Sequence, residues 1–153
     1  MIFELNTYDP NLVKPMREEA VAIGFRELYT PEEVNREFGK KGYTLAFVNS
    51  VCGCAAGKAR PGLKLAVDLA SANGYLPENL VTVFAGMEKR AVEEVRKYFT
   101  GFPPSSPQIA LLKDGVLISL VQRKDIENSD EFRVSELIGS ILKKHVKRSN
   151  YGQ

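Results

Sequence analysis

Apolar residues follow two kinds of spacing along this chain, and each kind predicts a different element. Apolar positions three or four residues apart predict helices over residues 10–23, 55–73, 91–99 and 134–142. Compact apolar runs bounded by turn formers predict strands over 43–49, 80–85, 109–112 and 116–121, with a short edge strand over 25–28. Helices and strands therefore alternate through the middle of the chain.

Capping motifs mark where two of the helices begin and end. Asp9–Pro10 is an N-cap followed by proline at the first helical position, and Gly24 is the corresponding stop. Thr30 and Glu33 have the spacing of a capping box. They predict a second, short helix that ends before Gly39.

Proline and glycine shape the rest of the chain. Pro61 falls inside the helix predicted over 55–73, where it should kink the helix or split it. Residues 102–107 hold three prolines and must form an irregular turn. An Asp-Gly pair at 114–115 between two apolar runs predicts an antiparallel hairpin. A βαβ unit followed by a hairpin predicts an α/β fold, with a mixed central sheet flanked by helices.

Composition narrows the class of protein. The chain has 153 residues, 44% hydrophobic and 26% charged, as expected for one globular domain. A formal net charge of +2 is too small to indicate a nucleic-acid-binding surface. The N-terminus lacks a signal-peptide pattern, and no run reaches the roughly 18 apolar residues of a membrane helix. We therefore expect a cytoplasmic protein with no nucleic-acid or membrane partner, where paired cysteines tend to be catalytic, redox-sensing or metal-bound.

The two cysteines provide the main chemical candidate. Cys52 and Cys54 flank Gly53, directly after a predicted buried strand and at the start of a helix. Free N–H groups and the helix dipole stabilise a thiolate at such a position, and Lys58 and Arg60 would add positive potential. Thiol–disulfide exchange needs an exposed thiolate and a second thiol to resolve the mixed disulfide. The motif therefore predicts a redox site.

The single-residue spacing of the cysteines bears on which kind of site this is. A bridge between positions so close is strained and closes a very short loop, which favours an easily reduced disulfide over a stabilising one. Two inert buried cysteines are an alternative. A Cu(I)-thiolate carrier is another, whereas structural zinc needs four ligands and the chain has one histidine, His145.

Three other features have a functional and an ordinary interpretation. Ser106–Pro107, just before a strand, predicts a cis peptide bond that would expose the Ser106 backbone to an extended partner, or else a plain rigid loop. His145 is expected to be a core or cap residue rather than a catalyst. The basic residues at 143, 144, 147 and 148 are expected to be a solvated helix end.

The cysteine segment carries a specific resemblance. VNSVCGCAAG at residues 48–57, with ARPG at 59–62, closely resembles the bacilliredoxins, small thioredoxin-like proteins with a Cys-Gly-Cys site. Further matching stretches are PPSSP at 103–107, ALLKDG at 110–115, GF at 24–25 and TPEE at 30–33. The resemblance implies a thioredoxin-like three-layer sandwich over residues 1–153, as one domain with an N-terminal helical extension.

The resemblance also implies a reaction, the removal of bacillithiol from proteins that carry it as a mixed disulfide. Cys52 would be the nucleophile and Cys54 the resolving thiol, with Pro107 the cis-proline that faces them. Clients would be S-bacillithiolated or disulfide-bonded proteins, with bacillithiol as co-substrate and no bound cofactor or metal. A general disulfide isomerase or reductase, or a redox-silent interaction module, is the alternative. The substrate-binding residues would be Gly53, Ser106, Pro107, Lys58 and Arg60, with Lys64 completing a landing area for the carboxylates of bacillithiol.

The chain departs from related patterns in two places. Thioredoxins hold a carboxylate on the strand beneath the active site, whereas residues 45–48 here are LAFV. An arginine-histidine pair of the family is replaced by RKD at 123–125. The role of that histidine is therefore not transferred to this chain.

Overall fold

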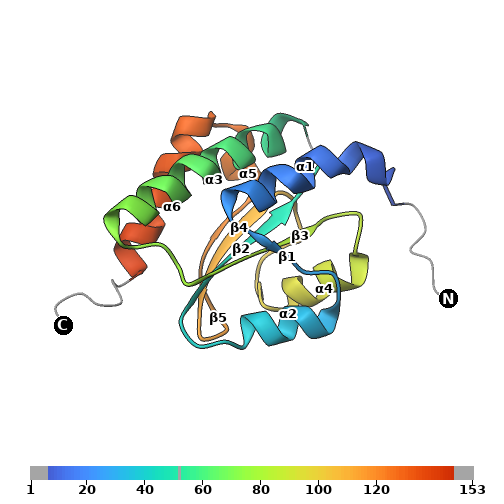
Figure 1. The fold of residues 1–153 in the computed structure, drawn as a ribbon, viewed down its shortest axis with the longest axis horizontal. Helices are drawn as coiled ribbons and strands as arrows, with labels where there is room; N and C mark the ends of the chain where they lie inside the picture. The colour runs from blue at the N-terminus through green and yellow to red at the C-terminus, as the bar shows by residue number, and fades with distance from the viewer. Residues whose placement is uncertain (1–6, 52, 147–153) are drawn as a thin grey trace.

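The computed structural model describes residues 7–51 and 53–146, and Figure 1 shows their arrangement. Helices lie on both sides of one central sheet. In chain order the elements are α1 (Pro10–Ile23), β1 (Arg26–Glu27), α2 (Pro31–Phe38), β2 (Tyr43–Asn49), α3 (Gly53–Asn73), β3 (Asn79–Phe84), α4 (Lys89–Lys97), β4 (Gln108–Lys113), β5 (Val116–Val121), α5 (Arg123–Glu127) and α6 (Glu131–His145).

The sheet is mixed, with strand order β1-β3-β2-β4-β5. β1 and β2 both run parallel to β3, whereas β4 runs antiparallel to β2 and to β5. In the middle of the sheet Phe47 lies between Thr82 on β3 and Ile109 on β4. β2 is therefore central, as the compact apolar run at 43–49 predicted.

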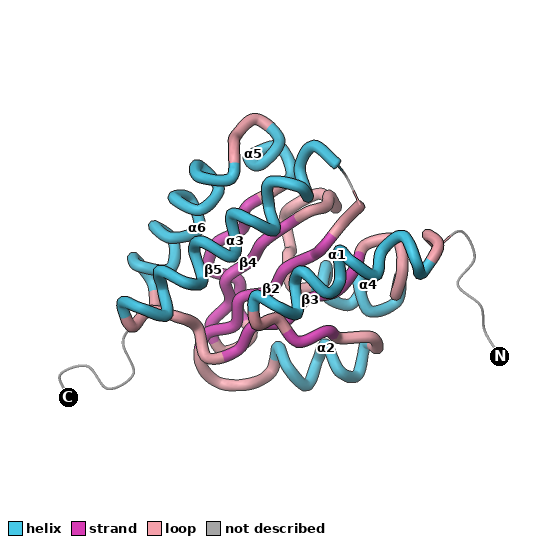
Figure 2. Tube along the Cα trace, turned by 45° about the horizontal axis from the view of Figure 1, so that its top comes forward, coloured by secondary structure: helices cyan, strands magenta, loops and turns pink. Residues whose placement is uncertain are grey.

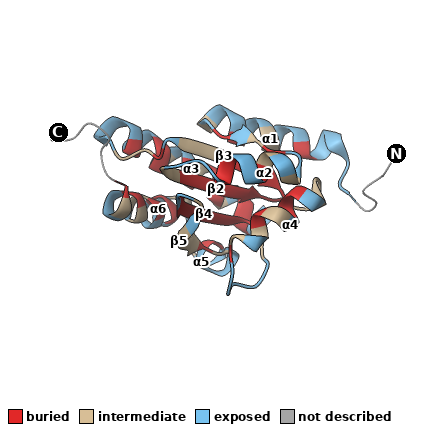
Figure 3. Ribbon diagram, turned by 90° about the horizontal axis from the view of Figure 1, so that it is seen from below, coloured by how far each residue is buried: buried red, intermediate tan, exposed pale blue. Residues whose placement is uncertain are grey.

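Side chains of β2 alternate between two hydrophobic cores, one on each face of the sheet. Leu45 and Phe47 pack in a core with residues of α3 and α6, which we call the α3/α6 core. Ala46 and Val48 pack in a second core with residues of α2 and α4, which we call the α2/α4 core. Figure 2 shows α1, α3 and α6 on one side of the sheet, and Figure 3 shows the buried residues concentrated on its strands. The architecture is a three-layer α/β sandwich.

The predicted capping motifs are present. Asp9 accepts a hydrogen bond from the Asn11 N–H at 2.9 Å, and α1 ends before Gly24. Thr30 accepts from the Glu33 N–H at 3.1 Å while the Glu33 carboxylate accepts from the Thr30 N–H at 3.2 Å. Both caps satisfy backbone donors that the first turn of a helix leaves unpaired.

The β4–β5 hairpin also forms as predicted. Asp114 and Gly115 have φ values of 51° and 81°, the left-handed conformation that a tight hairpin turn requires. The Asp114 carboxylate in addition accepts a hydrogen bond of 2.7 Å from the Gly42 N–H. The turn is thereby attached to the segment that leads into β2.

Two features of the helices differ from the sequence analysis. Of the two outcomes expected at Pro61, the split does not occur, because α3 continues from Gly53 to Asn73. Burial of α3 against α6 and the sheet stabilises the helix enough to tolerate the missing N–H. The short helix α5 was not predicted, because its capping box uses Gln122 in place of the usual serine or threonine. No helix within the described ranges has the length and apolar character to cross a membrane.

Candidate active site

The cysteine segment joins the end of β2 to the start of α3. Cys52, the predicted nucleophile, lies outside the described residues. Gly53 is the first residue of α3 and Cys54 the second, and both are exposed. Cys54 is therefore accessible in the first turn of a 21-residue helix.

The proline loop lies beside this segment. The Ser106–Pro107 peptide bond is cis, as predicted. The Ser106 hydroxyl donates a long hydrogen bond of 3.4 Å to the hydroxyl of Ser50, two residues before Cys52 in the chain. The pairing of Val48 with Gln108 places the end of β2 next to the start of β4. Antiparallel pairing thus brings the two loops to one edge of the sheet, although 56 residues separate the two serines.

Arg60 is placed differently from the exposed position expected for it. It is 8% exposed, and its Nε forms an ion pair of 2.8 Å with Glu19 on α1. Its Nη1 donates at 3.0 Å to the Asn49 side chain and at 3.0 Å to the Ser50 carbonyl. The residue lies on the inner face of α3, so its guanidinium braces the turn after β2 and is not part of a solvent-facing landing area.

The two lysines predicted to bind substrate lie on the outer part of α3. Lys58 Nζ donates to the Glu127 carbonyl of α5 at 2.9 Å. Lys64 is exposed and pairs with Asp68 at 2.9 Å, one turn along the helix. The structure therefore separates both lysines from Arg60, which faces inward.

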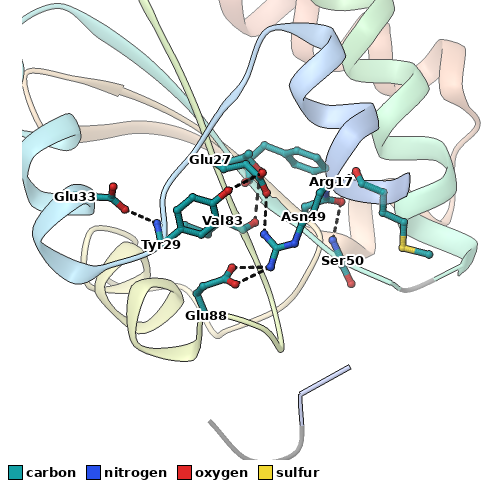
Figure 4. Close-up of polar contacts among 11 residues, drawn as sticks. Arg17, Glu27, Tyr29, Glu33, Asn49, Ser50, Val83 and Glu88 are labelled. Atoms are coloured by element: carbon teal, nitrogen blue, oxygen red, sulfur yellow. Dashed lines mark hydrogen bonds and ion pairs between the residues drawn. The ribbon is translucent and has the colours of Figure 1, made fainter. Parts of the chain in front are cut away.

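A charged cluster that the sequence analysis missed anchors α1 to the sheet. Figure 4 shows Arg17 between Glu27 and Glu88, with ion pairs of 2.7 and 2.6 Å. The Tyr29 hydroxyl donates to Glu27 at 2.9 Å. Partial burial and this hydrogen bond raise the pKa of Tyr29 to about 12, so the phenol is neutral near pH 7. Charges spaced this far apart in sequence give no local signal.

Asn49 connects that cluster to the cysteine segment. Its side-chain amide donates to the Met16 carbonyl of α1 at 3.0 Å, and its Oδ1 accepts from the Ser50 N–H at 2.8 Å. The same Oδ1 receives the Arg60 hydrogen bond. One indication in the sequence pointed to a structural role for Asn49, namely its polar side chain at the end of an otherwise mostly apolar strand.

The remaining candidates lie elsewhere. His145 occupies the last turn of α6, and Figure 1 shows this end of α6 at the opposite end of α3 from the cysteine segment. Lys143 and Lys144 are exposed in the same turn, as expected, whereas residues 147 and 148 lie outside the described part of the chain. Residues 45–48 are buried apolar side chains, so β2 places no carboxylate beneath the cysteines.

Replacing Arg60 by methionine should lower the free energy of unfolding by about 2 kcal/mol. The change removes one ion pair and two hydrogen bonds that are shielded from water. Urea unfolding followed by circular dichroism measures the loss. Lys64→Met, on the exposed side of the same helix, is the matched control and should shift stability by less than about 0.5 kcal/mol. Equal stability of the two variants would contradict the bracing role of Arg60.

Comparison with known protein families identifies proteins that are similar to this chain in sequence. A family model described as disulphide isomerase matches residues 8–146. A bacilliredoxin of Geobacillus kaustophilus is 52% identical over 122 residues, which cover 78% of this chain and 81% of the relative. A bacilliredoxin of Bacillus cereus is 45% identical over 133 residues, covering 87% and 90%. Another from Cytophaga hutchinsonii is 45% identical over 136 residues, covering 89% and 95%.

Solved structures give the fold. A putative oxidoreductase with a thioredoxin fold superposes with a TM-score of 0.54 at 15% identity, covering 76% of this chain and 96% of the other. The thioredoxin-like domain of the Arabidopsis protein NCP superposes with a TM-score of 0.56 at 16% identity, covering 82% and 81%. The three-layer sandwich described above is therefore a thioredoxin fold.

Proposed function

The chain belongs to the bacilliredoxin family and is a thiol–disulfide oxidoreductase, and from this premise we propose that it removes bacillithiol from S-bacillithiolated proteins. One observation carries the proposal. Ser50, which precedes the cysteine motif in the chain, contacts Ser106 of the Ser106–Pro107 loop. A client disulfide could then meet a thiol and the backbone of the half-buried Ser106 at the same edge of the sheet.

The reaction is a sequence of thiol–disulfide exchanges. The Cys52 thiolate attacks the bacillithiol sulfur of the mixed disulfide, and the client cysteine leaves as a thiolate that takes up a proton. Cys52 is then joined to bacillithiol by a disulfide bond. Cys54 attacks the sulfur of Cys52 and releases bacillithiol, which leaves a Cys52–Cys54 disulfide for an external dithiol to reduce. Alternatively a second bacillithiol attacks, and oxidised bacillithiol leaves.

Groups around the cysteines would bind the two halves of the substrate. The Ser106 backbone would pair with an extended client segment next to Pro107, and Gly53 would contribute to binding from the start of α3. The carboxylates of bacillithiol would lie near Lys58 and Lys64 on the outer part of α3. Bacillithiol is the co-substrate in this proposal, with no bound cofactor or metal, and the reducing cytoplasm is the proposed compartment.

A second candidate is a general disulfide isomerase or reductase. The description of the matching family model as disulphide isomerase favours it. Isomerisation uses the same attacking thiol, but the mixed disulfide is resolved by another cysteine of the client. The two candidates therefore differ in which disulfides react fastest and not in the nucleophile.

Relative rates on matched substrates test the proposal. One client protein is prepared with bacillithiol and with glutathione on the same cysteine, and release of the client thiol is followed by intact mass. We expect the bacillithiolated form to react at least about tenfold faster, a preference within reach of a few polar contacts. Equal rates on the two forms would overturn the proposal. Faster repair of a scrambled multi-disulfide protein than of either form would favour the isomerase.

A further inference from the structure

Unpartnered buried polar atoms gather around the proline loop. Within residues 7–51 and 53–146, three buried side-chain atoms lack a hydrogen-bond partner, namely Arg96 Nε, Ser105 Oγ and Gln108 Oε1. Ser105 and Gln108 immediately flank Ser106–Pro107, and Arg96 Nη2 donates to the Ser105 carbonyl at 2.8 Å. Buried polar groups are normally paired, so a group of three at one loop calls for an explanation.

The strand register places these atoms on one side of the sheet. Along β4, Ile109 and Leu111 pack in the α3/α6 core, whereas Ala110 packs in the α2/α4 core. Because side chains alternate along a strand, Gln108 lies on the side of Ala110. Arg96 follows Val95, which packs in the same α2/α4 core. Arg96 thus reaches the proline loop from the face of the sheet opposite the cysteine-bearing helix.

Arg96 differs from the other half-buried and buried arginines of the fold. Arg17 and Arg60 each form ion pairs with glutamates. No carboxylate among the described residues pairs with Arg96, and its burial lowers the pKa of the guanidinium. Burying a cation without a counter-charge is unfavourable, so α4 carries this arginine at a cost to stability.

The contacts of Arg96 lead toward the reacting cysteines. Its guanidinium holds the Ser105 carbonyl, Ser106 contacts Ser50 at 3.4 Å, and Ser50 lies two residues before Cys52. The three unpartnered atoms have complementary polarity, because Arg96 Nε is a donor, Gln108 Oε1 is an acceptor and the Ser105 hydroxyl can be either. Such a set suits bridging by a buried water. Arg96 is therefore built into the support of the loop and not into an ion-pair network.

We propose that Arg96 is a positioning residue for disulfide substrates. By fixing the Ser105 carbonyl, Arg96 keeps the Ser106 backbone in place for pairing with the client. The inference rests on the proposed pairing of the client with the Ser106 backbone. It applies to any client that binds there, whether the client cysteine is joined to bacillithiol or to another thiol.

Two reactions of the Cys52 thiol distinguish a positioning role of Arg96 from a general structural role. Disulfide exchange with a peptide client needs the loop, whereas alkylation of Cys52 by iodoacetamide does not. In a Cys54→Ser background, which leaves one reacting thiol and a single turnover, Arg96→Met should lower the second-order rate constant of exchange about tenfold, mainly through weaker client binding. The alkylation rate and its pH profile should change by less than about twofold. Arg96→Lys should recover part of the loss, because it can still donate to Ser105.

Controls make each outcome decisive. Arg90→Met, on the exposed face of α4, should behave like the parent protein in both reactions. If Arg96→Met does not fold, Arg96→Gln replaces it, with the same expectation. Parallel losses of alkylation and exchange, or no loss of exchange, would overturn the positioning role. Peptides carrying bacillithiol and glutathione are both used, so a lack of preference between them would count against the proposed function while leaving the Arg96 comparison intact.

Discussion

Replacing Cys52 by serine should reduce disulfide exchange to background, a loss of roughly 10³-fold or more. The hydroxyl of serine is not ionised near neutral pH and cannot form a disulfide, so the first exchange step has no nucleophile. Replacing Cys54 by serine should leave that step intact and remove the internal route of resolution. The Cys54→Ser protein should therefore accumulate with the bacillithiol moiety joined to Cys52.

Intact-mass measurement of both variants distinguishes these outcomes. Each variant is mixed with a bacillithiolated client in the absence of free bacillithiol, so that a second thiol cannot clear the adduct. Peptide mapping locates the modification. An unmodified Cys54→Ser protein, or an adduct on Cys54 in the Cys52→Ser protein at the parent rate, would show that the roles of the two cysteines have been assigned incorrectly.

Replacing Gly62 by leucine should destabilise the fold by about 3 kcal/mol or more. A Cβ on Gly62 would lie 2.6 Å from Cγ1 of Val134 and 3.0 Å from the Glu131 carbonyl oxygen, both belonging to α6. The branched Val134 side chain has little rotameric freedom in a helix, and the carbonyl belongs to the backbone. The two helices must therefore separate, and the α3/α6 core between them loses contacts.

Gly57 provides the matched control, because it lies on the same helix and a Cβ added there would have no other described part of the fold within 4 Å. Gly57→Leu should raise stability by up to about 0.8 kcal/mol, since leucine is the better helix former. Urea midpoints of the two variants measure the difference. A double variant, Gly62→Ala with Val134→Ala, should be less destabilised than the sum of its single changes. Similar midpoints for Gly62→Leu and Gly57→Leu would show that the helices adjust freely.

Features determined by neighbouring residues were predictable from the sequence. The Thr30–Glu33 capping box and the Asp114–Gly115 turn each depend on a few adjacent residues, and both form as expected. The buried strand at 43–49 was recognisable because a compact, mostly apolar run has few other stable placements. Together they gave the layers of the fold and the position of the cysteine segment at the start of α3.

Features that depend on distant contacts were not predictable. The burial of Arg60 is made possible by Glu19, 41 residues earlier in the chain, which supplies the counter-charge. Arg96 resembles any other arginine on an amphipathic helix until β4 brings Ser105 against it. Pro61 illustrates the same limit for secondary structure, because the packing that keeps α3 continuous comes from other parts of the chain.

The register between β2 and β4 has a consequence for anyone who wishes to redesign this protein. Moving the proline loop along the sheet by one residue, roughly 3.4 Å, would turn every side chain of β4 to the opposite layer. Ile109 would then have to fit where Ala110 now packs, and both interiors would need new sequences. The position of the loop is fixed by how side chains fill the α3/α6 core and the α2/α4 core. Substrate preference is therefore more readily altered by changing exposed residues of the loop than by moving the loop.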